Sequence, residues 1–89
     1  MTSSTPIIAG VVRDGKGDPV AAARVYIVAA PVSVPDIAAL SDSDGRFSIG
    51  VPMTGHYTIE ASAEGWRPGR TVINVGPDVN HVELRLSGS

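Results

Sequence analysis

Glycine and proline are the residues that most constrain what this chain can fold into. There are 10 glycines and 7 prolines among 89 residues, and they are spread evenly along the chain. These are the two poorest helix formers, so few windows remain that could hold three helical turns. The sequence therefore favours short strands joined by turns over helices.

Between the turns, apolar and polar residues alternate with the period of a half-buried strand. Phe47, Ile49 and Val51 share one face of such a strand. The same alternation predicts inward-facing side chains at Tyr57, Ile59, Ala61, Val82, Leu84 and Leu86. The predicted strands cover residues 7–12, 24–29, 40–43, 46–51, 57–63, 71–75 and 82–86. A tight hairpin turn is expected at Asp44-Gly45, because glycine readily takes positive φ.

Seven short strands separated by turn residues are typical of an antiparallel β-sandwich with Greek-key connections. Two sheets then bury one apolar face each against a shared core. We therefore expect an all-β fold with a single sandwich domain over residues 7–87. It would follow a flexible N-terminus (1–6) and precede a short tail (88–89).

Charge and composition exclude several classes of protein. The net charge is −2 and only 7 residues are Lys or Arg, which argues against binding nucleic acid through phosphate contacts. Without cysteine there is no disulfide scaffold, thiolate metal site or cysteine nucleophile. No apolar run is long enough for a membrane helix and no signal peptide is visible. We expect no membrane association, and either a cytoplasmic location or export without a cleaved signal.

Short runs with a defined order and spacing extend from Ile8 to Leu86. They are Gly10-Val11-Val12-Arg13-Asp14, Gly17-Asp18-Pro19-Val20, Ala23-Arg24-Val25, Ser43-Asp44-Gly45-Arg46-Phe47-Ser48-Ile49, Val51-Pro52, Gly55, Tyr57-Thr58-Ile59, Ala63-Glu64-Gly65-Trp66 and Val82-Glu83-Leu84-Arg85-Leu86. Together they resemble a carboxypeptidase regulatory-like domain over almost the whole chain. The resemblance implies the seven-stranded prealbumin-like (transthyretin-like) sandwich. It also implies an accessory module rather than an enzyme, although a shared fold does not fix function.

Residues that could support catalysis are few. His56 and His81 are the two histidines, and each precedes a predicted strand, where we expect it to be exposed. A histidine that activates a nucleophile needs a hydroxyl within hydrogen-bond reach and an orienting acid. The fold relative 5-hydroxyisourate hydrolase carries a Tyr-Arg-Gly-Ser tail, which the ending Arg85-Leu86-Ser87-Gly88-Ser89 does not reproduce, because the Tyr is missing and two residues separate Arg85 from Gly88. We expect no catalytic, metal-binding or cofactor-binding residues, and keep a small transthyretin-like hydrolase as an alternative.

Trp66, Arg67 and Arg70 form the first candidate binding segment. Tryptophan and arginine are the residues most enriched at binding hot spots. Trp66 either caps one end of the core, with both arginines solvated, or anchors a partner. An exposed Trp66 would also suit a carbohydrate-binding module, which we keep as the alternative function.

An apolar loop over residues 29–39 is the second candidate, because its two prolines prevent regular ladder pairing. Its candidate contact residues Val32, Val34 and Ile37 either fold over an open end of the sandwich or meet a partner. Edge strands offer a further route, to homo-oligomers. The function that we expect is a non-catalytic interaction or structural module whose partner is a protein or a larger assembly.

Overall fold

Every regular element is a β-strand within the part of the chain that the computed structural model describes, residues 6–34 and 38–88. The strands are β1 (Ile7–Asp14), β2 (Arg24–Ala29), β3 (Ala38–Leu40), β4 (Arg46–Gly50), β5 (Gly55–Ser62), β6 (Trp66–Arg67), β7 (Gly69–Val75) and β8 (Val79–Gly88). In these residues there is no helix long and apolar enough to cross a membrane. The expectation of an all-β fold is confirmed.

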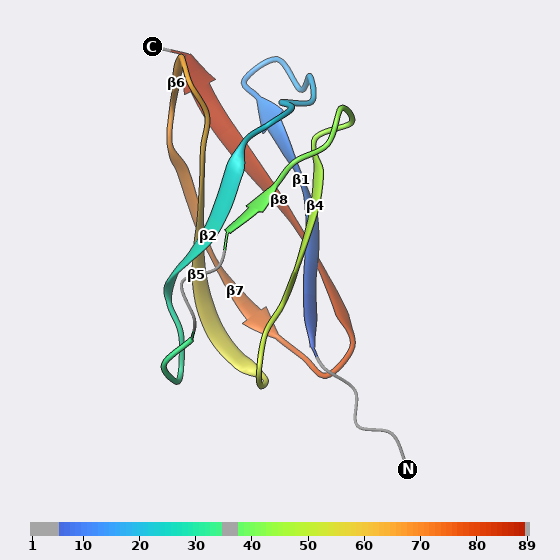
Figure 1. The fold of residues 1–89 in the computed structure, drawn as a ribbon, viewed down its shortest axis with the longest axis vertical. Coiled ribbons are helices and arrows are strands. Elements are labelled where there is room, and N and C mark those ends of the chain that lie inside the picture. The colour runs from blue at the N-terminus through green and yellow to red at the C-terminus, as the bar shows by residue number, and fades with distance from the viewer. Residues whose placement is uncertain (1–5, 35–37, 89) are drawn as a thin grey trace.

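The strands form two four-stranded sheets that face each other (Figure 1). The strand order is β4-β1-β8-β6 in the first sheet and β3-β2-β5-β7 in the second. The predicted sandwich is confirmed, but it has eight strands instead of seven. We expected a loop at the additional strand, β6, where Trp66 and Arg67 instead pair antiparallel with Gly88 and Ser87 of β8. Only Pro68 separates β6 from β7, so the chain crosses between the sheets at that residue.

The pairing of β1 with β8 departs from the purely antiparallel sandwich that the sequence predicted. These strands run parallel, through a register that extends from Ile7 opposite Val79 to Asp14 opposite Leu86. The other pairs of named strands are antiparallel. Parallel neighbours need a long connection, and here the whole intervening chain provides it. The first and last strands thus lie side by side in the middle of the first sheet.

The turn at Asp44-Gly45 is tight, as predicted, but it joins strands of different sheets. The strand expected over residues 40–43 lies earlier, as β3, so it includes the last two residues of the predicted apolar loop. Oδ1 of Asp42 accepts hydrogen bonds from the N–H groups of Asp44 and Arg46, both at 2.9 Å, and Gly45 has a φ of 76°. Because β3 belongs to the second sheet and β4 to the first, this turn is a corner of the sandwich and not a hairpin.

The core lies between the sheets and follows the predicted alternation. Its buried apolar residues are Ile8, Val12, Val20, Ala23, Val25, Phe47, Ile49, Val51, Tyr57, Ile59, Ala61, Val75, Leu84 and Leu86. Val82 is half-buried against this core. Gly10 also faces it, where a Cβ atom would lie 2.2 Å from the carbonyl oxygen of Val82. The absence of a side chain at Gly10 therefore allows β1 and β8 to approach closely.

Candidate functional site

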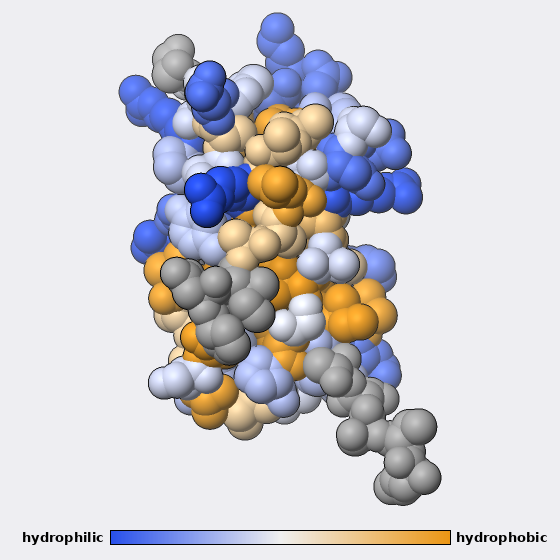
Figure 2. Space-filling view, in the orientation of Figure 1, coloured by the Kyte–Doolittle hydropathy of each residue, from blue (hydrophilic) through white to orange (hydrophobic). Residues whose placement is uncertain are grey.

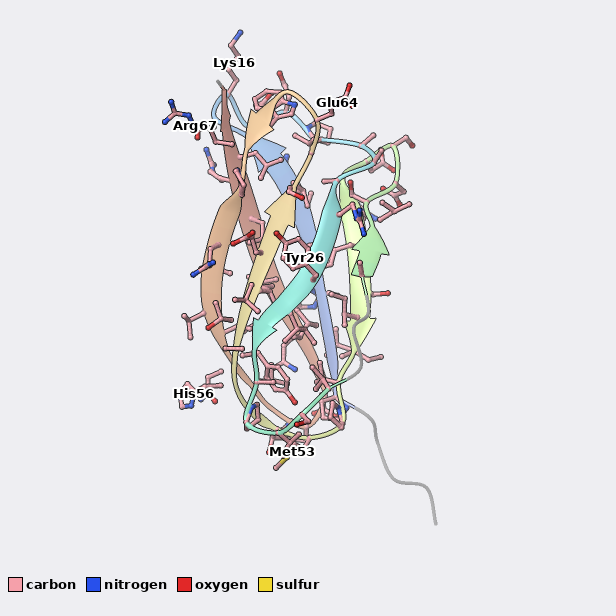
Figure 3. All side chains as sticks on the ribbon, turned by 60° about the vertical axis from the view of Figure 1, so that its left-hand side comes forward. Lys16, Tyr26, Met53, His56, Glu64 and Arg67 are labelled. Atoms are coloured by element: carbon pink, nitrogen blue, oxygen red, sulfur yellow. The ribbon has the colours of Figure 1, made fainter. Side chains whose placement is uncertain are left out.

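The two ends of the sandwich differ in charge. Figure 3 shows Lys16, Glu64 and Arg67 toward one end of the molecule and Met53 and His56 toward the other. The charged residues of the first end come from the loops that follow β1 and β5, and from β6.

We call the opposite end the apolar end and define it as residues 28–34, 51–54 and 76–79. These segments lie where β2 leads to β3, β4 to β5 and β7 to β8. Asp78 is their one Asp, Glu, Lys or Arg residue. With a single charge among these described residues, the apolar end can meet an apolar partner at little electrostatic cost.

Several apolar side chains are exposed at the apolar end. Val28, Val32 and Met53 are each 43% exposed, and Val79 is 50% exposed. Figure 2 shows apolar surface over the lower half of the face it presents and hydrophilic side chains toward the top. Val28 is the extra residue of a β-bulge, where the register between β2 and β5 shifts. Bulges redirect side chains at strand ends, and Val28 is the second-to-last residue of β2.

Two contacts hold the loops of the apolar end in place. The ring of Pro31 lies against Gly55, where a Cβ atom would be 2.9 Å from Cγ of the proline. The hydroxyl of the buried Tyr57 donates a hydrogen bond of 2.7 Å to the carbonyl oxygen of Met53. The β2–β3 loop and the β4–β5 turn are therefore both anchored on the first residues of β5.

The predicted contact residues of the apolar loop divide between two roles. Val34 is half-buried and packs against the core, whereas Val32 faces solvent. Ile37 lies outside the described residues. The loop thus covers the end of the core through Val34 and leaves Val32 exposed, and contact with a partner stays a prediction. Val28 and Met53 were missed because neither belongs to the predicted loop.

The structure separates the residues of the other predicted segment. Trp66 is partly buried and packs against the core, and Arg67, next to it, is exposed. Arg70 lies in the other sheet, on the outer face of β7. The position of Trp66 favours the capping role over a carbohydrate platform, because a sugar stacks on an exposed ring.

Arg70 belongs to a network on the outer face of the second sheet, which joins three strands. Its Nε and Nη2 atoms donate to Oε1 of Glu60 at 3.0 and 2.9 Å, and the hydroxyl of Tyr26 donates to the other carboxylate oxygen. The hydrogen bond from Tyr26, followed by that from Arg70, lowers the pKa of Glu60 below its ordinary value. The same bond to Glu60 raises the pKa of Tyr26. Both carboxylate oxygens are occupied, so the network links β2, β5 and β7 and does not form an open site.

The two histidines lie in different sheets. Both are exposed, His56 on β5 of the second sheet and His81 on β8 of the first. His81 borders a groove of about 730 Å³ that runs over β1, whose lining contains Arg46 and Asp44 but no hydroxyl or thiol group. Within residues 6–34 and 38–88, no cluster of three or more His, Cys, Asp or Glu residues could hold a metal ion.

Comparison with known families agrees with this architecture. The model of the carboxypeptidase regulatory-like domain matches residues 7–87. The chain belongs to this family. The match confirms the resemblance that the sequence suggested, and it covers every described strand of this regulatory-like domain except the last residue of β8. A search of the curated proteins found no match.

Solved structures with the same fold come from proteins of different kinds. A DUF3823 family protein from Parabacteroides merdae superposes with a TM-score of 0.74 at 15% identity, covering 98% of this chain and 48% of that one. The 3-chlorocatechol 1,2-dioxygenase of Rhodococcus opacus gives 0.73 at 15% identity, with coverages of 99% and 61%. The minor pilin GBS52 of Streptococcus agalactiae gives 0.71 at 17% identity, with coverages of 100% and 47%. The regulatory-like domain thus spans about half the length of these chains, and at such identities the likeness shows the fold alone.

Proposed function

We propose that this regulatory-like domain is a non-catalytic interaction module that binds a protein partner, alone or within a larger assembly, through its apolar end. The observation that carries the proposal is the exposure of Val32 and Met53 on neighbouring loops whose described residues carry no charge. The centres of protein interfaces are depleted in charged residues and enriched in methionine. A minor pilin is among the proteins of the same fold, which supports a role in an assembly.

The chemistry of the apolar end defines the partner. Burial of apolar surface drives association with little dependence on salt, whereas contacts between exposed charges weaken as the ionic strength rises. The partner therefore presents an apolar surface to Val32 and Met53, and the complex persists at high salt. Because the two residues come from different connections, one partner surface would span both loops.

Affinity capture from a lysate of the source organism, with the purified chain as bait at low and high salt, tests this proposal. We expect the double substitution Val32→Glu and Met53→Glu to lose the captured protein, because binding would bury two unpaired carboxylates. Leu40→Glu is the matched control, since Leu40 is 66% exposed on β3, outside the apolar end. Three results contradict the proposal. The double variant still captures the protein, Leu40→Glu loses it to the same extent, or the wild-type chain captures no protein at all.

The non-catalytic part of the proposal has a separate assay. The hydrolase alternative requires His56 or His81 to act on a substrate such as 5-hydroxyisourate. We expect no turnover of this substrate above the uncatalysed rate. Turnover that disappears in the His56→Ala or His81→Ala variant would establish an enzyme and remove this part of the proposal.

A further inference from the structure

Strand β7 is the outermost strand of the second sheet. It pairs with β5 over seven residues, from Gly69 to Val75, and no other strand of residues 6–34 and 38–88 continues this sheet beyond it. An edge strand presents a row of unpaired N–H and C=O groups that can pair with another chain. The edge of β7 is therefore a surface for strand pairing.

This edge lacks the features that protect most edge strands, which are charges, prolines and bulges. Residues 71–75 read Thr-Val-Ile-Asn-Val, with four β-branched residues and no charge or proline, and their register with β5 is continuous. Val72 is 64% exposed on the outer face. The charge of Arg70 is directed away from the edge, because its guanidinium is held by Glu60 on the neighbouring strand.

The other described edge strands are less suited to pairing. Strand β3 has three residues and β6 has two, so each offers few backbone groups. Strand β4 has five residues, and those exposed on its outer face are Arg46, Ser48 and Gly50. Pairing through β4 would therefore bring no apolar side chains together on that face, whereas pairing through β7 would cover Val72.

We propose that β7 pairs antiparallel with β7 of a second copy of this chain, about a two-fold axis at Val72. Val72 is the midpoint of Gly69–Val75, so this register aligns the whole strand. Val72 then lies opposite the partner's Val72, Arg70 opposite the partner's Asn74, and Thr71 opposite the partner's Ile73.

The sequence of β7 is self-complementary in this register. No like charges face each other, and the two exposed valines become a cross-strand apolar pair, which favours pairing. A two-fold axis makes the contact isologous and closed, so the association stops at the dimer. The second sheets of the two copies join into one continuous sheet of eight strands.

Sedimentation equilibrium from about 10 µM to about 1 mM tests the proposal, since pairing through one strand from each copy is expected to be weak. The mass should rise from the 9.2 kDa of one chain toward twice that value. Val72→Lys sets two like charges opposite each other and weakens dimerisation at least about tenfold. Leu40→Lys leaves dimerisation unchanged, because Leu40 is 66% exposed on β3, at the opposite edge of the same sheet.

A charge exchange tests the register itself. Val72→Glu alone also weakens dimerisation. An equal mixture of the Val72→Lys and Val72→Glu chains restores it, because opposite charges then face each other. Any of three results overturns the proposal. The wild-type chain is monomeric at about 1 mM, Leu40→Lys weakens dimerisation as much as Val72→Lys does, or the mixture stays monomeric. Val72 lies outside the apolar end, so Val72→Lys leaves partner capture intact, and the two proposals fail separately.

Discussion

Replacement of Ser41 by alanine is expected to destabilise the fold far more than a serine-to-alanine change usually does. Ser41 is the one buried polar residue among those the structure describes, with 6% exposure. Its Oγ accepts a 2.9 Å hydrogen bond from the N–H of Ala23 and donates one of 2.7 Å to the carbonyl oxygen of Val20. The Ser41→Ala variant therefore leaves a buried donor and a buried acceptor without this partner.

The magnitude follows from these two groups. A buried donor or acceptor left unsatisfied costs about 1–3 kcal/mol, so the loss for the pair is about 2–6 kcal/mol. A chain of this length has a free energy of unfolding of about 4–13 kcal/mol. With a urea dependence of about 1 kcal/mol per molar for a small domain, the unfolding midpoint should fall by at least about 2 M.

Urea unfolding, followed by the fluorescence of Trp66, is the assay, because this single tryptophan packs against the core. Ser43→Ala is the matched control, since Ser43 is exposed two residues later and should change stability by no more than about 0.5 kcal/mol. A midpoint for Ser41→Ala within about 0.5 M of the wild-type value would refute the reasoning.

Two further predictions concern the sheets. The pKa of Glu60 is held below its ordinary value of 4.5, chiefly by the hydrogen bond from Tyr26, so the stabilisation is present above pH 4.5 and is lost as the pH falls through the folded-state pKa. Urea midpoints of wild type and Glu60→Gln should therefore converge below pH 4.5, and a constant gap would contradict this. Gly10→Ala should destabilise by about 1–3 kcal/mol, because its Cβ would meet the carbonyl oxygen of Val82 at 2.2 Å. Gly15→Ala, with open space around it, is the control in the same unfolding assay.

The core could be predicted from the alternation within each strand, whereas the pairing of the strands could not be predicted from the sequence. The side chains expected to be buried on β5 are buried: Tyr57, Ile59 and Ala61. Successive side chains of a strand point to opposite faces of the sheet, whichever strands lie beside it. The neighbours themselves depend on contacts between distant segments. The parallel β1–β8 pair joins residues about seventy positions apart, and nothing in the local pattern of either strand distinguishes it from an antiparallel pair.

The candidate site was predictable only in part for the same reason. The prolines of the predicted loop indicated an apolar connection, and Val32 is exposed there. Met53 joins Val32 at the apolar end because β2 and β5 are neighbours, which the sequence pattern does not reveal. The grouping of Arg70 with Trp66 rested on their short separation in sequence, but the chain changes sheets at Pro68 between them.

The parallel pairing of β1 with β8 has a mechanical consequence. Since the two strands point the same way, the start of β1 and the end of β8 lie at opposite ends of the molecule (Figure 1). A pulling force applied between these points would shear one strand along the other and load all eight residue pairs at the same time. A hairpin that is pulled at its open end instead separates one residue pair after another. Forced unfolding is governed by the unfolding rate, and simultaneous rupture makes that rate slow. A domain with this geometry is suited to transmit tension along its long axis.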